Sequence, residues 1–74
     1  MKKFYDVKLK ITAKHIGDNN EFWKLEESAD CVVFDTGARK IWTYDRGYEN
    51  THVLRHTHVL PRGDIYTIVF EFKP

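Results

Sequence analysis

Disulfides and membrane spans are both missing from this sequence, and each absence removes a class of protein. The 74 residues contain a single cysteine, Cys31, so no internal disulfide can form. Small secreted domains usually depend on such cross-links, and a lone thiol fits a reducing compartment. The longest apolar runs, 31–34 and 68–70, fall far short of the ~20 residues that a membrane-spanning helix needs. We therefore expect a cytoplasmic protein with no membrane partner.

Motifs for catalysis and for cofactor binding are also absent. The four glycines are isolated turn residues, namely Gly17, Gly37, Gly47 and Gly63. They form neither a P-loop nor a dinucleotide-binding pattern. The one serine, Ser28, lies among acidic residues without a glycine-rich elbow, and Cys31 begins an apolar stretch where a thiol is expected to be buried. The sequence thus predicts a non-enzymatic protein without a cofactor.

Net charge gives little indication of a partner. Twelve lysines and arginines face 11 aspartates and glutamates, which leaves a formal charge of +1. A nucleic-acid partner must then depend on a local cluster. Lys8, Lys10 and Lys14 form such a stripe, which would bind the phosphates of a nucleic acid while exposed aromatic rings stacked on its bases. The alternative is that these lysines protect a solvated strand from aggregation.

Strict alternation in the first segment predicts a long half-buried strand over residues 4–16. The residues expected to face the core are Tyr5, Val7, Leu9, Ile11 and Ala13. Turn-forming residues follow at 17–20. At this length the chain has room for one domain, spanning 1–74, which buries only about 60% of its unfolded surface.

Residues 21–29 are compatible with two structures. They form a strand if Trp23 and Leu25 point inward. A tight turn would then place Trp23 opposite Lys14, on the lysine face, unless a one-residue bulge corrected the register. They form a short helix if Asn19 or Asn20 acts as its N-cap.

The next two strands, 31–35 and 40–45, form a predicted hairpin around Gly37. A two-residue loop places Val33 opposite Trp42 on one face, and on the other face it pairs two further apolar residues, Phe34 with Ile41. Both faces of this hairpin are then apolar, which is typical of central strands or of strands covered by a partner subunit.

Two further strands are expected at 51–60 and 65–73, the second with Tyr66, Ile68, Phe70 and Phe72 on one face. The fold class is therefore all-β, or β-rich α+β with one short helix near 20–29. We expect a small antiparallel meander of five or six strands, built as a curled sheet or a small barrel.

Three histidines, His52, His56 and His58, are expected on one face of the strand 51–60. His56 and His58, about 6.5–7 Å apart by Cα, would reach one zinc ion. Candidates for a third ligand are Cys31, His15, Glu49 and Asp64. The alternative is a set of surface histidines.

Large aromatic residues exceed what a small core needs, and this surplus predicts an interface with Trp42, Tyr44 and Tyr48 as contact residues. The expected function is a non-enzymatic binding module that acts through a protein–protein interface, as an adaptor or inhibitor of a larger machine, and that also forms a homo-oligomer. The alternatives are a nucleic-acid-binding barrel that uses Lys8, Lys10 and Lys14, and a metal-binding protein that uses His56 and His58.

Overall fold

The computed structural model describes residues 1–72, which form a single antiparallel sheet with strand order β4-β3-β2-β1-β5. Its elements are β1 (Lys2–Lys14), β2 (Trp23–Asp35), β3 (Lys40–Arg46), the 3-10 turn η1 (Tyr48–Asn50), β4 (His52–Val59) and β5 (Ile65–Phe72). The all-β prediction is confirmed, as is the curled sheet, which does not close into a barrel. Among the described residues, no helix is long and apolar enough to cross a membrane.

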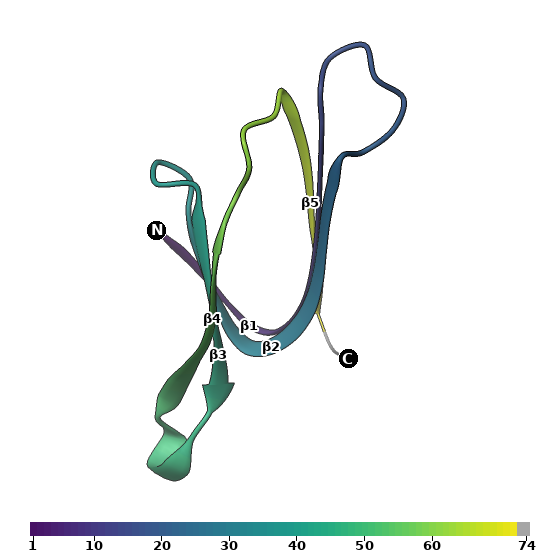
Figure 1. Cartoon of the computed structure of the whole chain (residues 1–74). Helices are drawn as coiled ribbons and strands as arrows, with labels where there is room; N and C mark the ends of the chain where they lie inside the picture. The colour runs from purple at the N-terminus through teal and green to yellow at the C-terminus, as the bar shows by residue number, and fades with distance from the viewer. Residues whose placement is uncertain (73–74) are drawn as a thin grey trace.

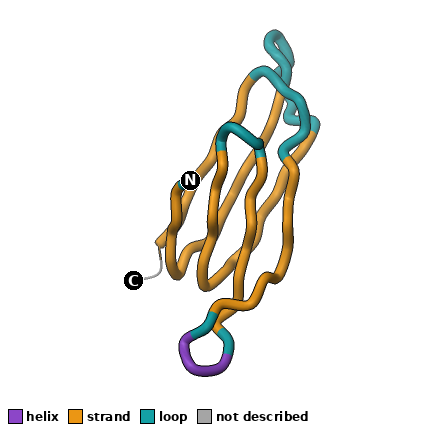
Figure 2. Tube along the Cα trace, turned by 90° about the vertical axis from the view of Figure 1, so that its left-hand side faces the viewer, coloured by secondary structure: helices purple, strands orange, loops and turns teal. Residues whose placement is uncertain are grey.

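The two long strands β1 and β2 bend together into a U, so the sheet has a concave and a convex face (Figure 1). The first four strands follow one another as a meander, whereas β5 returns to pair with β1 on the far side. Figure 2 shows the loops that join β1 to β2, β2 to β3 and β4 to β5 at one end of the molecule, with η1 at the other end. We call the concave side of the sheet the inner face and the convex side the outer face.

The segment with two possible structures is a strand, so the helix alternative is wrong. Residues 23–35 form one uninterrupted strand, β2. Its first residue, Trp23, lies opposite Ala13 rather than Lys14, and Phe22 N–H donates to the Ala13 carbonyl over 3.0 Å. The register is thus the bulge-corrected one, which keeps Trp23 on the inner face. Gly17, with φ +90°, supplies the left-handed residue that the connecting turn requires.

The alternation of side chains inverts at one level of the sheet, in β1 and β2 alike. On β1 the inner residues are odd-numbered from Val7 onward. Before this point the inner residue is the even-numbered Phe4. Asp6 between them has a φ of 53°, a left-handed conformation that aspartate tolerates better than most residues. The prediction that Tyr5 faces the core is therefore wrong, because Tyr5 is 52% exposed on the outer face.

On β2 the inversion falls at Asp30, between Ala29 and Val32, which both belong to the core. The Asp30 carboxylate accepts a hydrogen bond of 2.7 Å from the Arg46 backbone N–H, which ties the bend of β2 to the end of β3. The two strands stay in register across this level, with Tyr5 opposite Cys31 before it. The two strands therefore bend together and keep the same antiparallel register on both sides of the bend.

The core lies on the inner face and joins residues from all parts of the U. Its fully buried members are Val7, Leu9, Ile11, Val32 and Ile41, and Ala29, Phe34 and Leu60 complete the cluster. From β5, three residues of the predicted inward set contact it, namely Tyr66, Ile68 and Phe70. The fourth, Phe72, is 61% exposed, although its ring lies 6.3 Å from that of Phe4. Lys73, at the expected end of this strand, lies outside the described residues.

A second irregularity inverts the faces of β4. His56 lies opposite Thr43, but Leu54 lies opposite Tyr44, so Arg55 is an extra residue in the ladder. The one-residue slip sends His52 and Leu54 to the outer face, whereas His56 and His58 stay on the inner face. The prediction that the three histidines share a face is therefore wrong.

Replacing a leucine of the core should destabilise the domain far more than replacing one of the surface. Leu9 has 0% exposure and Leu54 has 53%. We expect Leu9→Ala to lower the free energy of unfolding by about 2–5 kcal/mol and Leu54→Ala by about 0.5 kcal/mol or less, as measured by urea denaturation followed by tryptophan fluorescence.

Should Leu9→Ala fail to fold, the milder Ile11→Val substitution removes one methylene from the same cluster. It should cost about 0.5–1.5 kcal/mol. Equal shifts for Leu9→Ala and Leu54→Ala would contradict the assignment of the inner face as the core.

Candidate functional site

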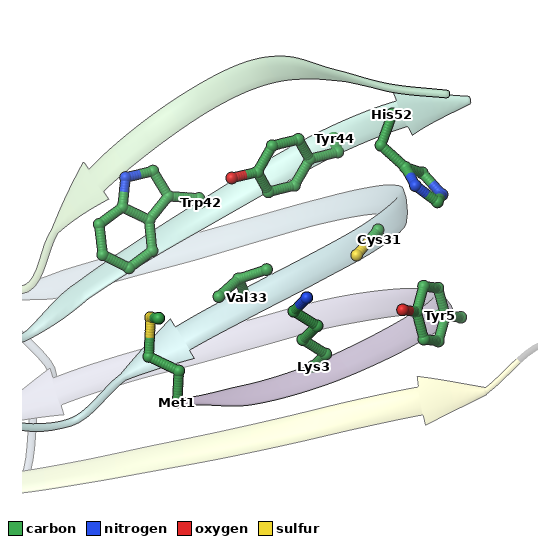
Figure 3. Close-up of a pocket in the computed structure, with 8 residues that line it drawn as sticks. All are labelled: Met1, Lys3, Tyr5, Cys31, Val33, Trp42, Tyr44 and His52. Atoms are coloured by element: carbon green, nitrogen blue, oxygen red, sulfur yellow. The ribbon is translucent and has the colours of Figure 1, made fainter. Parts of the chain in front are cut away.

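A hollow of about 580 Å³ on the outer face lies over the arm of the U that contains β3 and the ends of β1 and β2 (Figure 3). We call it the outer groove. It is lined by Met1, Lys3, Tyr5, Cys31, Val33, Trp42, Tyr44 and His52. Cys31 and Val33 are buried and form its floor, and the rings of Tyr5, Trp42 and Tyr44 stand around them.

The register of the β2–β3 hairpin builds the centre of the outer groove. Val33 lies opposite Trp42 and Cys31 opposite Tyr44, so two apolar floor residues each face an aromatic ring. The predicted Val33–Trp42 pairing is confirmed, as is the pairing of Phe34 with Ile41 on the inner face. Apolar side chains on both faces of this hairpin thus serve two purposes, since one set fills the core and the other lines the groove.

The two inversions of the sheet complete the groove from the outer strands. The left-handed residue at Asp6 turns Tyr5 outward, and the bulge in β4 turns His52 outward. The rings of Tyr5 and His52 then lie 5.9 Å apart, at one end of the groove. Strands β1 and β4, which have two strands between them in the sheet, contribute to the same hollow.

The positive charge of Lys3 borders the outer groove. Lys3 and His52 line it, whereas no aspartate or glutamate of residues 1–72 is part of the lining. Burial raises the pKa of the Cys31 thiol, and the nearby Lys3 ammonium opposes this only in part. Cys31 is therefore a neutral, apolar floor group near pH 7 and not a nucleophile.

Of the predicted interface residues, the structure brings two together. Trp42 and Tyr44 both line the outer groove, but Tyr48 lies on η1, is 85% exposed and does not line it. Sequence reasoning missed Tyr5 and His52 as groove residues. Their positions depend on backbone irregularities, and a period-two pattern does not reveal these.

Two of the three predicted phosphate-binding lysines are paired with carboxylates. Lys8 Nζ lies 2.8 Å from Glu26 Oε1, and Lys10 Nζ lies 2.9 Å from Glu71 Oε1. Hydrogen bonding and charge attraction raise the pKa of Lys10 and lower those of Glu26 and Glu71. Lys14 ends β1 beside the loop. The glutamates offset much of the positive charge that a nucleic-acid backbone would need.

A cluster of potential metal ligands lies on the inner face, and we call it the Glu27 cluster. Glu27 Oε1 lies 3.1 Å from His56 Nδ1 and 2.9 Å from His58 Nε2, and the ligating atoms all lie within 4.8 Å of one another. The third member is thus Glu27, which the sequence did not indicate. None of the four expected candidates belongs to the cluster. Cys31 lies in the outer groove, Glu49 lies in η1, and His15 pairs with Asp64 at 3.5 Å.

The carboxyl of Glu27 is largely enclosed. Burial by itself raises its pKa, but the Thr43 hydroxyl, His58 and His56 outweigh this effect and hold the pKa below its usual value. The side chain is 10% exposed. Within the described chain, neither Oε2 nor the Thr43 hydroxyl has a hydrogen bond of normal geometry. The cluster is an ionised carboxylate between two imidazoles.

Comparison with protein-family models, with curated proteins and with solved structures found no match for this chain. Fold and sites together define an open, curled five-stranded β domain with an aromatic groove on one face and a carboxylate–histidine cluster on the other.

The thiol of Cys31 should react slowly in the native protein. Cys31 is 4% exposed and its pKa is raised, so little of it is thiolate near pH 8 and a reagent reaches it only after local opening. We expect Ellman's reagent to label the native protein at least about tenfold more slowly than the chain unfolded in urea. A native rate equal to the unfolded rate would show that the groove floor is open.

Proposed function

We propose that this chain is a non-catalytic protein-binding domain whose outer groove takes an apolar side chain from an acidic segment of a partner protein. The observation that carries this proposal is the outer groove itself, with its buried floor and its three aromatic rings. A volume of about 580 Å³ falls within the range of sites that bind a side chain or small ligand.

The composition of the groove is that of a protein contact. Tryptophan and tyrosine dominate the energetics of interfaces because they bury large areas and lose little side-chain entropy on binding. Trp42 and Tyr44 are held by β3, which is paired with a strand on each side, and both are only partly buried in the free chain. The groove is thus pre-organised, which lowers the entropic cost of binding.

The charge of the lining selects the kind of segment. Lys3 provides positive charge at the groove, the His52 ring lines it as well, and carboxylates of the described chain are absent from its lining. An apolar or aromatic residue flanked by aspartate or glutamate complements both features, because its ring enters the groove and its carboxylates meet Lys3 and His52. The ion pairs of Lys8 and Lys10 give no comparable support to nucleic-acid binding.

A domain of this kind acts by occupying a surface, as an adaptor or as an inhibitor of a larger assembly. A single cysteine that is buried and reduced fits a place in the cytoplasm. A second copy of this chain is an alternative occupant of the groove, and it would make the domain a homo-oligomer.

Peptide selection tests the proposal directly. A phage-displayed library of random linear peptides is selected on the wild-type domain and the enriched peptides are titrated in NMR experiments. We expect enriched peptides to carry an aromatic or large aliphatic residue beside aspartate or glutamate, and to shift the Trp42 indole signal. Trp42→Ala should weaken binding by more than about tenfold, as expected for a central aromatic contact.

Tyr48→Ala is the matched control, because it removes an exposed aromatic ring outside the groove and should leave binding unchanged. Lys3→Glu should favour basic over acidic peptides. Peptides that bind elsewhere on the domain, or binding that survives Trp42→Ala, would refute the proposal. A stable dimer by light scattering that Trp42→Ala converts to monomer would instead show that a second copy occupies the groove.

A further inference from the structure

The Glu27 cluster joins two strands that are not neighbours in the sheet. Glu27 belongs to β2, His56 and His58 belong to β4, and β3 lies between them in the ladder. They meet because the sheet curls, which brings β4 over the bend of β2. A second contact between β4 and β2 is made by the Arg55 guanidinium, which donates to the Ser28 carbonyl over 2.6 Å.

The arrangement of donor atoms matches that of a metal site. Zinc–ligand bonds of about 2.0–2.1 Å in tetrahedral geometry place ligand atoms about 3.3 Å from one another. Glu27 Oε1 lies 3.1 and 2.9 Å from the two imidazole nitrogens, and all three atoms lie within 4.8 Å. Small side-chain adjustments are enough to surround one ion.

The enclosed carboxylate is a second, independent indication of a ligand. The Glu27 side chain is nine-tenths buried, and its Oε2 atom has no hydrogen-bond partner in the described part of the chain. Buried carboxylate oxygens normally find partners, because an unpaired one costs free energy. A cation held by both carboxylate oxygens of Glu27, beside the two histidines, would supply that missing interaction.

We propose that Glu27, His56 and His58 form a binding site for a divalent transition-metal ion of the zinc type. Two imidazoles and one carboxylate are the ligands of choice for such ions, whereas magnesium and calcium prefer oxygen ligands alone. The His56 side chain is 55% exposed, so the ion reaches the site from solvent. A bound ion cross-links β2 and β4 and holds the curl of the sheet.

Thermal unfolding of the full chain, without a histidine tag and after chelator treatment, tests this site. Zinc chloride at about 100 times its dissociation constant should raise the melting temperature by on the order of 10 °C. Magnesium chloride at the same concentration should not raise it. No shift up to millimolar zinc would overturn the proposal and would leave the cluster as a carboxylate hydrogen-bonded to two imidazoles.

Variants decide which residues bind the ion. His56→Ala removes an exposed ligand with little risk to folding, and Glu27→Gln keeps the shape of the buried one. Each should weaken zinc binding by more than about tenfold. His52→Ala is the matched control, since it removes a histidine of the same strand that points to the outer face, and it should leave the shift intact.

NMR signals of the imidazole rings provide a readout independent of stability. Zinc should shift the rings of His56 and His58 and leave those of His15 and His52 in place. Zinc binding that is lost in His52→Ala, or retained in full in His56→Ala, would overturn the assignment. These outcomes are independent of the outer groove, since the groove contains neither Glu27 nor His56.

Discussion

The bend shared by β1 and β2 governs how this chain buries its core. A sheet of five strands has two faces, and a chain of 74 residues has apolar residues enough to fill only one interior. Because of the bend, the inner faces of the two arms of the U lie toward each other. Residues from both arms, such as Ile11 and Ile41, therefore join one cluster. Asp6 and Asp30 mark its position, where inward and outward side chains exchange places on both strands.

Both candidate sites are consequences of that bend. On the outer face, the exchange turns Tyr5 and Cys31 toward the same hollow as Trp42, which gives the groove its rings and its floor. On the inner face, the curl brings β4 over β2, and Glu27 meets two histidines from a strand that it does not pair with. The bulge at Arg55 divides the histidines between the faces and assigns one to each site.

Much of this architecture could be predicted from periodicity. The alternation from Val7 to Ala13, the inward set of β5 and the pairing of Val33 with Trp42 each follow from a period of two and from turn residues. The structure has all of them except the exposed Phe72 of β5. The same rule failed for Tyr5 and for the grouping of His52 with His56. A single left-handed or extra residue reverses the pattern, and aspartate or arginine at such a position carries no distinctive signal.

The sequence by itself determined that this protein is a small antiparallel β domain with a hairpin apolar on both faces, because side-chain alternation and turn chemistry are local properties. Tertiary structure alone decided that residues 23–35 are a single strand, that the curled sheet does not close into a barrel, and that Glu27 lies against His56 and His58. These features depend on contacts between residues distant in the chain, such as Trp23 with Ala13 and Arg46 with Asp30. Their free energy comes from burial and register across the whole sheet, which no local pattern encodes.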